Sequence, residues 1–496
     1  MKYFLGIDQG TTGTTSIVFD EEWNICGKGY FEHKQYYPKP GWVEHDPEEI
    51  WKKTKESVAE ALSNAKISAG ELDAIGLANQ GETCMAWDKK TGKPVYNAIV
   101  WQDRRGSKQA DELKEAYGDL IMQKTGLTID AYFSALKIKW ILENVPGTKE
   151  KAEKGDLLVG TLDTWLLWKM TAERVYITDS STASRTMLFN IHTNRWDDEI
   201  LDIIGIPVSL LPGIKTSAEI YGTTDPGFLD APVPIAGSVV DQPAALFGQA
   251  CFDKGAVKTT YGTGCFMLMN TGEKPVYSNN GLLTAAVWSL NGKLTYALDG
   301  GVYIGGAAIQ WLRDGIGIIN HAGETEALAR SVPDSSGLYF VPAFSGLAAP
   351  YWDQYTRGTM VGITGGTSRA HIVRATLEAI AYQVAENLEV MEKDSGIKIE
   401  TMRADGGAVA NTFLMQFQAD ILGVPVDVPV ITETTALGAA YLGALGIGEL
   451  DSVDSIKNIW KLNRRYMPQI SENQREGMME QWKKAVATSR SWINKE

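Results

Sequence analysis

Near its amino end the chain carries a short run of residues suited to binding a phosphate group. Asp8, Gly10, Thr11 and Thr12 fall within five positions, between two β-rich runs. Glycine lets backbone N–H groups approach an anion, threonine hydroxyls donate hydrogen bonds to it, and a carboxylate such as that of Asp8 can hold Mg²⁺. The run therefore predicts a phosphate-binding turn at the tip of a hairpin, with a magnesium site at Asp8.

Two further glycine turns follow in the second half of the chain. Gly262-Thr263-Gly264 is again flanked by β-rich runs, and Asp405-Gly406-Gly407 lies between a predicted strand and a predicted helix. A nucleotide can lie directly against backbone at a strand-to-helix turn that has no side chains in the way. Each turn alone also fits an ordinary hairpin or connection, but three of them in this order favour a nucleotide site.

The elements around these turns alternate between strands and helices. The two hairpins, over residues 3–19 and 256–270, lie about half a chain apart and suggest duplicated domains with facing phosphate loops. Asp46-Pro47 is expected to begin a helix, because Asp is a favoured cap and Pro a favoured first residue. Alternation on this scale predicts an α/β architecture. We place the boundary near Gly248, giving domains 1–248 and 249–496.

Composition narrows the class of protein. With 496 residues the chain is long enough for two or three domains, and its net charge of −14 disfavours binding to nucleic acid or an anionic membrane. A local nucleotide site remains compatible with that charge, because backbone N–H groups can hold phosphates. The four cysteines include no CxxC pair, which is typical of a reducing compartment.

Several other kinds of site are disfavoured. The first apolar run stops at Asp8, too short for a signal peptide, and no run reaches the ~20 apolar residues that span a bilayer. The most apolar stretch, 436–447, is short and broken by glycines. The five histidines form no zinc-binding pattern, and there is no GxSxG nucleophile motif. We expect a soluble cytoplasmic protein.

Longer patterns bring a family resemblance. Residues 132–144, and 358–363 followed by 371–378, match two patterns of the FGGY carbohydrate kinases. Further stretches, such as DQPAALFGQA and YGTGCFMLMNTGEKP, resemble the glycerol kinase branch, and the likeness covers nearly the whole chain. The resemblance implies two actin-like (ribonuclease H-like) ATPase domains flanking a deep catalytic cleft. The implied activity is ATP-dependent phosphorylation of a small polyol, with glycerol as the best guess.

The resemblance also implies roles for particular residues. Asp241 would be the general base that takes the proton from the attacking hydroxyl, although an Asp at this place also fits a helix cap. Gln242, Glu82 and Tyr132 would hydrogen-bond the acceptor, and Trp101 and Phe266 would pack on its carbon chain. Solvated Glu82 and simple core packing of the aromatic residues are the ordinary alternatives.

ATP and Mg²⁺ are the implied cofactors. Phosphate contacts are expected from Thr11, Thr12 and Thr263, and Asp8 would organise Mg²⁺. The residues expected to border the ribose and adenine are Gly306, Gln310, Gly407 and Asn411. A homodimer or homotetramer is an expectation carried over from the family alone.

Three positions depart from the family pattern. Gly81 stands where glycerol kinases carry an arginine beside the following glutamate, which leaves Glu82 without its expected counter-charge. Thr15 replaces an arginine near the phosphates, and Asp103 gives a W-x-D-x-R pattern closer to the ketose kinases. Either the lost contact at Gly81 is supplied elsewhere, or the acceptor is larger and fills the gap. In either case, a Gly81→Arg substitution is expected to improve glycerol use.

Two alternatives therefore stay open beside glycerol phosphorylation. The first keeps the enzyme class but changes the acceptor to a tetritol, pentulose or cyclitol. The second is a non-catalytic actin-like ATP switch. A switch needs no polyol pocket, so a cavity that brings Glu82, Tyr132, Asp241, Gln242 and Phe266 together would favour an enzyme.

Overall fold

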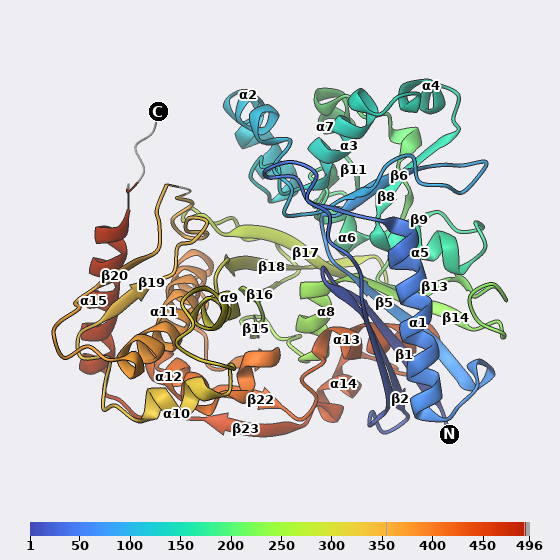
Figure 1. The fold of residues 1–496 in the computed structure, drawn as a ribbon. Coiled ribbons are helices and arrows are strands. Elements are labelled where there is room, and N and C mark those ends of the chain that lie inside the picture. The colour runs from blue at the N-terminus through green and yellow to red at the C-terminus, as the bar shows by residue number, and fades with distance from the viewer. Residues whose placement is uncertain (354, 491, 493–496) are drawn as a thin grey trace.

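The computed structural model describes residues 1–353, 355–490 and 492, and two large sheets dominate it (Figure 1). The first sheet has the order β13-β14-β5-β1-β2-β3, and the second has the order β17-β18-β16-β15-β21-β22-β23. The strands of the first sheet are β1 (Tyr3–Gln9), β2 (Gly13–Asp20), β3 (Ile25–Glu32), β5 (Leu72–Asn79), β13 (Ala218–Thr223) and β14 (Pro234–Val240). Those of the second are β15 (Val257–Tyr261), β16 (Cys265–Gly272), β17 (Leu283–Leu290), β18 (Lys293–Val302), β21 (Met402–Asp405), β22 (Val426–Pro429) and β23 (Leu462–Tyr466).

Both sheets are built around the same unit. β1 pairs antiparallel with β2 and parallel with β5, and β15 pairs antiparallel with β16 and parallel with β21. A parallel pair needs a crossover, and in each sheet helices supply it. The two predicted hairpins are therefore confirmed, and so is the α/β architecture.

The first sheet is buried on both faces, which explains why β1 is a nearly continuous apolar run. One face is covered by α1 (Pro47–Ala65), whose start is fixed by the Asp46 carboxylate accepting a hydrogen bond from the Glu48 N–H at 2.9 Å. The other face is covered by α13 (Thr434–Gly446), which comes from the last quarter of the chain (Figure 1). The predicted helix start at Asp46-Pro47 is confirmed.

Glycines allow α13 to pack very closely on the first sheet. A Cβ added to Gly6 or Gly76 would lie nearer to the carbonyl oxygens of Ala436 and Ala439 than the 3.0 Å that real Cβ atoms keep. Gly438 of α13 meets the backbone of α8 (Asp241–Gly248) in the same way. The apolar, glycine-broken stretch is thus an interior helix. No helix in the described part of the chain is long and apolar enough to cross a membrane.

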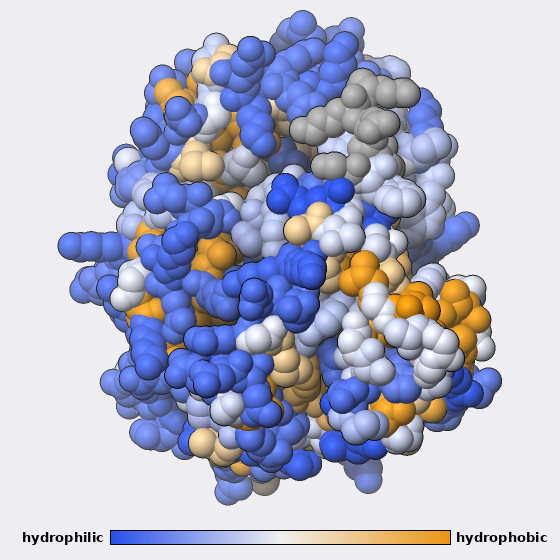
Figure 2. All heavy atoms as spheres, turned by 90° about the vertical axis from the view of Figure 1, so that its left-hand side faces the viewer, coloured by the Kyte–Doolittle hydropathy of each residue, from blue (hydrophilic) through white to orange (hydrophobic). Residues whose placement is uncertain are grey.

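Helices α11 (Arg369–Ser395) and α12 (Thr412–Leu422) pack on the second sheet, and α15 (Glu472–Ser489) packs on α12 at the outer edge of the molecule (Figure 1). The face that carries them is mainly hydrophilic with scattered apolar spots (Figure 2). The sequence alone predicts a helical tail after Asp451, and this is wrong in part, because β23 adds an edge strand antiparallel to β22. The β23 sequence, LNRRY, does not alternate between apolar and polar residues, because nearly all of the strand is exposed, so no periodic pattern predicted it.

Smaller elements complete the molecule. A four-stranded sheet of order β4-β7-β6-β8 lies with helices α2 to α5 above the first sheet in the view of Figure 1. Its strands are β4 (Glu44–His45), β6 (Cys84–Asp88), β7 (Ala98–Ile99) and β8 (Leu157–Thr161). The remaining helices include α2 (Ser107–Thr125), α3 (Ser134–Asn144), α4 (Thr148–Glu153), α5 (Leu162–Met170), α6 (Ser180–Ser184), α7 (Asp198–Ile204), α9 (Gly306–Gln310), α10 (Glu324–Arg330) and α14 (Val453–Ile459). The remaining strands include β9 (Ile177–Asp179), β10 (Phe189–Asn190), β11 (Arg195–Trp196), β12 (Gly213–Lys215), β19 (Tyr339–Val341) and β20 (Thr359–Val361).

Candidate active site

A cavity of about 450 Å³ lies where the tips of the two hairpins meet. It is lined by residues from both halves of the chain, so a bound molecule would touch both sheets. The predicted site residues that line it are Thr11, Thr12, Glu82, Trp101, Tyr132, Asp241, Gln242, Thr263 and Phe266. The two threonine-bearing turns therefore face one space, as the duplicated hairpins suggested.

At the first hairpin tip, a hydrogen bond joins the predicted phosphate turn to the predicted acceptor pocket. The indole Nε1 of Trp101 donates to Thr11 Oγ1 at 2.8 Å. Because this bond uses an acceptor site of the hydroxyl, the proton of Thr11 stays free to donate to an anion. Gln35 also holds this turn, through its Nε2 bonded to the Thr11 carbonyl at 2.8 Å.

Asp241 is the first residue of α8, at the end of strand β14. Val240 occupies the cap position, and the Asp241 carboxylate accepts a hydrogen bond from the Gln242 N–H at 2.7 Å. Burial, helped by the charge of Glu82, raises the pKa of Asp241 to about 6. A carboxylate that faces a cavity with a pKa near neutrality is suited to accept a proton from a hydroxyl.

Gln242 is held in one orientation by a buried lysine. Lys258 of β15 donates from Nζ to Gln242 Oε1 and, at 2.9 Å, to Thr260 Oγ1. With its oxygen engaged, the Gln242 amide presents Nε2 as the group free for another partner. Lys258 also brings a positive charge near Asp241 and Asp405.

Glu82 has a counter-charge, which corrects the expectation that it lacks one. Arg185 Nε lies 2.6 Å from Glu82 Oε1, and Arg185 Nη1 lies 3.0 Å from Asp299 Oδ2. Glu82 is buried, so the solvated alternative for this residue is wrong. The sequence could not show this partner, because Arg185 lies more than a hundred positions away, just after the short helix α6.

Aromatic side chains form one wall of the cavity. The rings of Trp101 and Tyr132 make an edge contact with centroids 5.7 Å apart, and Phe266 lines the same space from β16. The backbone carbonyls of Tyr132 and Phe133 accept hydrogen bonds from the buried Lys137 Nζ, which fixes this turn. All three rings are only half-buried, so they are not simply part of the core.

The predicted ribose and adenine contacts lie beside the second hairpin rather than in the cavity. Gly306 packs on this turn, with its N–H donating to the Gly262 carbonyl at 2.9 Å, and Gly406 packs on Tyr261 with φ of 87°. Gly407 is exposed with open space above it, and Gln310 is exposed at the end of α9. None of the four predicted nucleoside contacts lines the cavity itself.

Asn411 also forms hydrogen bonds that stabilise the fold. Its Oδ1 caps α12 by accepting from the Leu414 N–H at 3.0 Å, and its Nδ2 donates to Thr325 Oγ1 at 3.1 Å. Both ends of the amide are therefore engaged within the protein. Each end of the amide still has capacity for one more hydrogen bond, since the NH₂ group has two donors and the oxygen two lone pairs.

Asp8 lies at the end of β1 below the first turn. Burial raises its pKa to about 8, with the charges of Asp241 and Glu433 adding to the effect. No cluster of three or more metal-ligating side chains exists among the described residues. A single carboxylate in a site with excess negative charge fits Mg²⁺, which binds one or two carboxylates together with substrate phosphates.

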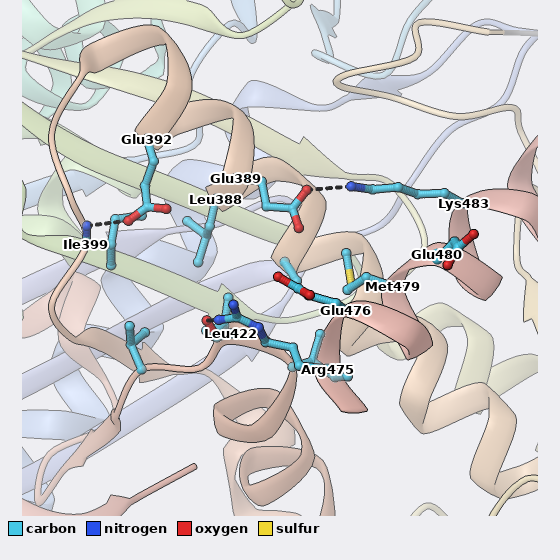
Figure 3. A pocket seen from close by; sticks show the side chains of 13 residues that line it. Leu388, Glu389, Glu392, Ile399, Leu422, Arg475, Glu476, Met479, Glu480 and Lys483 are labelled. Atoms are coloured by element: carbon cyan, nitrogen blue, oxygen red, sulfur yellow. Dashed lines mark hydrogen bonds and ion pairs between the residues drawn. The ribbon is translucent and has the colours of Figure 1, made fainter. Parts of the chain in front are cut away.

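A second hollow of about 390 Å³ lies far from these residues, between α11, α12 and α15 (Figure 3). Its charged side chains already serve the fold. Lys483 Nζ pairs with Glu389 Oε2 at 2.7 Å, Glu392 accepts from the Ile399 N–H at 2.6 Å, and Arg475 donates to the Leu422 carbonyl at 3.1 Å. The chemistry of the molecule is concentrated in the cavity between the hairpins.

Reasoning from the sequence missed Arg185, Lys258 and Asp299. Asp299 did leave a signal, since it is a lone acid in an otherwise apolar strand directly before Gly300 and Gly301. A charged residue in a strand that is buried on both faces needs a partner. Arg185 left no such signal, because an arginine at a helix end usually interacts with the helix carbonyls and solvent.

Two comparisons with protein families decide the relationship. The model of the N-terminal domain of the FGGY family of carbohydrate kinases matches residues 3–248, and that of the C-terminal domain matches residues 257–447. The chain belongs to the FGGY family of carbohydrate kinases. The resemblance inferred from the sequence is confirmed, as are the enzyme class and the fold with two actin-like ATPase domains.

Individual FGGY relatives are similar over their whole length. Glycerol kinase 2 of Thermotoga maritima is 58% identical over 99% of this chain and 99% of its own. The glycerol kinase of Deinococcus radiodurans is 56% identical over 99% of this chain and 98% of its own. The crystal structure of Plasmodium falciparum glycerol kinase with ADP has a TM-score of 0.92 and 38% identity, covering 100% of this chain and 99% of that one.

Proposed function

We propose that the protein transfers the γ-phosphoryl group of ATP to glycerol, giving sn-glycerol 3-phosphate. The observation that carries this proposal is the cavity in which Asp241, Glu82 and Gln242 face the two threonine turns. The names of the full-length relatives support glycerol as the acceptor and do not favour a larger polyol or a keto-sugar. They also disfavour a non-catalytic switch.

In this proposal the acceptor lies between the aromatic wall and the polar groups. Trp101 and Phe266 pack on its carbon chain, while Glu82, Tyr132 and Gln242 bond its hydroxyls. One terminal hydroxyl is directed at Asp241. The raised pKa of this carboxylate reflects its burial and the nearby Glu82 charge, and it makes Asp241 a better base than a solvated carboxylate.

The reaction is a displacement at phosphorus. The acceptor oxygen forms a bond to the γ-phosphorus, its proton passes to Asp241, and the bond to the β–γ bridging oxygen breaks to leave ADP. Little covalent chemistry is required of the protein, so positioning and charge stabilisation supply most of the rate. Thr11, Thr12 and Thr263 donate to the phosphates, and Gly306, Gln310, Gly407 and Asn411 border the nucleoside.

We infer that Mg²⁺ accompanies the nucleotide and is held at Asp8, where it would neutralise charge on the β- and γ-phosphates. The division into domains 1–248 and 249–496 remains our proposal. A cytoplasmic location and a homodimer or homotetramer are likewise predictions. Closure of the two domains around the substrates would exclude water, which otherwise competes for the phosphoryl group.

The test is phosphorylation of glycerol by the purified protein with Mg-ATP, followed by ³¹P NMR of the product. Parallel reactions with a tetritol, a pentulose and a cyclitol establish selectivity. We expect glycerol to have the highest kcat/KM, and the phosphate to be on a terminal oxygen. A higher kcat/KM for any other acceptor, or ADP release that no acceptor accelerates, would contradict the proposal.

A further inference from the structure

Among the described residues, Arg185 is the one Lys or Arg that lines the acceptor pocket. It is buried, lines the cavity, and bridges Glu82 and Asp299. Its guanidinium carbon also lies 5.9 Å from the centre of the Tyr132 ring. Arg185 therefore forms an ion pair with one predicted acceptor-binding residue, Glu82, and lies beside a second, Tyr132.

The hydrogen bonds of Arg185 leave one nitrogen available. Nε is bonded to Glu82 and Nη1 to Asp299, and Nη2 has no hydrogen-bond partner in the described part of the chain. Nη2 is not among the fully buried polar atoms that lack a partner, so it keeps accessible surface, and Arg185 lines the cavity. A hydroxyl oxygen of an acceptor could take this bond, because a guanidinium nitrogen is always a donor.

Gly81 explains why Arg185 can take this place. A Cβ at Gly81 would lie 3.2 Å from Val240 Cγ2 and 3.6 Å from Arg185 Cγ. Gly81 lines the cavity, and on the side of its Cβ position it is bordered by Val240 and by the stem of Arg185. A side chain at position 81 would compete with Arg185 for the room next to Glu82.

We propose that Arg185 determines how the acceptor binds, by fixing the Glu82 carboxylate through Nε and donating from Nη2 to an acceptor hydroxyl. Asp299 serves as its second anchor. Arg185 thus supplies, from another element, the cation that is absent at Gly81. This inference rests on the proposed function, since it concerns the acceptor pocket of the same reaction.

The inference changes the expectation for Gly81→Arg. In the otherwise unaltered chain Glu82 already has its counter-charge, so a second guanidinium adds repulsion and crowding and should not lower the glycerol KM. In an Arg185→Met background the same substitution should lower it, because the new guanidinium then meets an unpaired Glu82. The two backgrounds give opposite results only if Arg185 occupies this role.

The experiment measures kcat and KM for glycerol and for ATP, with thermal unfolding alongside. The variants are Arg185→Lys, Arg185→Met, Gly81→Arg and the Arg185→Met/Gly81→Arg pair. Arg374→Met is the control, because Arg374 is a half-buried arginine paired with a buried carboxylate, at 2.7 Å from Glu378, but does not line the cavity. Arg185→Lys keeps the charge and guards against loss of folding.

We expect the glycerol KM to rise about 10- to 100-fold in Arg185→Lys and Arg185→Met, the loss typical of a charge-assisted hydrogen bond. The ATP KM should stay within about threefold, and Gly81→Arg should recover part of the loss only when Arg185 is absent. Arg374→Met should lower the unfolding temperature without changing the glycerol KM.

The inference is overturned if a folded Arg185→Lys keeps the glycerol KM within twofold of the unaltered protein. It is equally overturned if the KM values for glycerol and ATP rise together, or if Gly81→Arg acts the same in both backgrounds. Should the unaltered protein fail to phosphorylate glycerol, the proposed function fails by itself. The role of Arg185 is then tested by measuring KM in the same variants for the polyol that most raises the unfolding temperature of the unaltered protein.

Discussion

At the scale of single residues, the charges around Asp241 set how readily its carboxylate accepts a proton. Asp241 is close to the negative Glu82 and within reach of the positive charges of Lys258 and Arg185. Burial and Glu82 raise the pKa of Asp241, and the two cations limit the rise. The carboxylate is therefore ionised at neutral pH and still basic enough to accept a proton.

Asp241→Asn should lower kcat about 10²- to 10⁴-fold while glycerol still stabilises the protein against heat, because the amide keeps the shape but cannot take a proton. The measurement is steady-state kinetics with a thermal-shift titration. Asp163→Asn is the matched control, since the pKa of Asp163 is also raised to about 6 by burial, but its carboxylate bonds Thr161 and Thr178 outside the cavity. A kcat for Asp241→Asn above a third of the unaltered value would rule out its role as base.

A site residue could be predicted from sequence when the residues around it in the chain indicate its role, and not when its role depends on a partner from another element. Thr11 and Thr263 lie in glycine turns, where the local pattern itself indicates an anion site, whereas the role of Asp241 came from the family resemblance, because its local pattern also fits a helix cap. Arg185 acts through partners more than a hundred positions away, and Lys258 acts through Gln242 on a different element, 16 positions away. Local patterns carry no information on such contacts, and that is why these two residues were missed.

At the scale of elements, two buried histidines connect a short strand to the first phosphate turn. His45 of β4 bonds Gln35 Oε1 through Nε2 at 2.6 Å, and Gln35 holds the Thr11 carbonyl. The His33 ring lies 4.6 Å from the His45 ring, and its two nitrogens have no partner within the described residues. Burial, and then the neighbouring His33, lower the pKa of His45 to about 3.

This arrangement predicts sensitivity to acid. An unfolded chain protonates His45 near pH 6.5, whereas the folded protein does so only near pH 3, so stability is lost as the pH falls below about 6.5. Between pH 7 and 5 His45 should account for about 2 kcal/mol of lost unfolding free energy. Urea unfolding of the unaltered protein and of His45→Gln at both pH values measures this difference. Equal losses in the two proteins would contradict the prediction.

The packing of α13 against the first sheet gives a second prediction for this scale. Gly76→Ala should destabilise the protein by about 1–3 kcal/mol or more, because its Cβ would overlap the Ala439 carbonyl and backbone cannot move aside as a side chain can. Chemical denaturation measures the change. Gly477→Ala is the control: this helix glycine has nothing within 4 Å of its Cβ position, so alanine should stabilise by about 0.5–1 kcal/mol. Destabilisation no larger than in the control would refute close packing at Gly76.

Elements were predicted well where a strong local pattern agreed with the final packing. Both hairpins follow from their turn residues, and the start of α1 follows from Asp46 and Pro47. The partner of each element did not follow. The apolar stretch 436–447 lies in α13, but its place on the first sheet could not be predicted. That place depends on Gly6 and Gly76, and nothing in the residues around these two glycines indicates the contact.

At the scale of the whole molecule, the two halves are interlocked and not merely joined. A hydrophobic cluster contains Phe4, Ala74 and Val239 from the first half together with Trp288 and Leu442 from the second. Residues 1–248 contain all strands of the first sheet, yet they lack the helix that covers one of its faces.

We therefore predict that a fragment of residues 1–248 does not fold alone. It should show weak near-ultraviolet circular dichroism and fast amide exchange in β1, β5 and β14, because one face of the sheet stays exposed. Co-expression with residues 249–496 should restore exchange protection. A fragment 1–248 with protection equal to that of the full chain would show that α13 is dispensable for this sheet.

The position of α13 in the chain also sets an order of events during synthesis. The ribosome completes the last strand of the first sheet at Val240 and reaches the start of α13 at Thr434, 194 residues later (434 − 240). At about 5–20 residues per second this takes on the order of 10–40 s. Throughout that interval the apolar strands of the first sheet lack the helix that completes their burial, so we expect the emerging chain to bind chaperones that act on the ribosome before the second half exists.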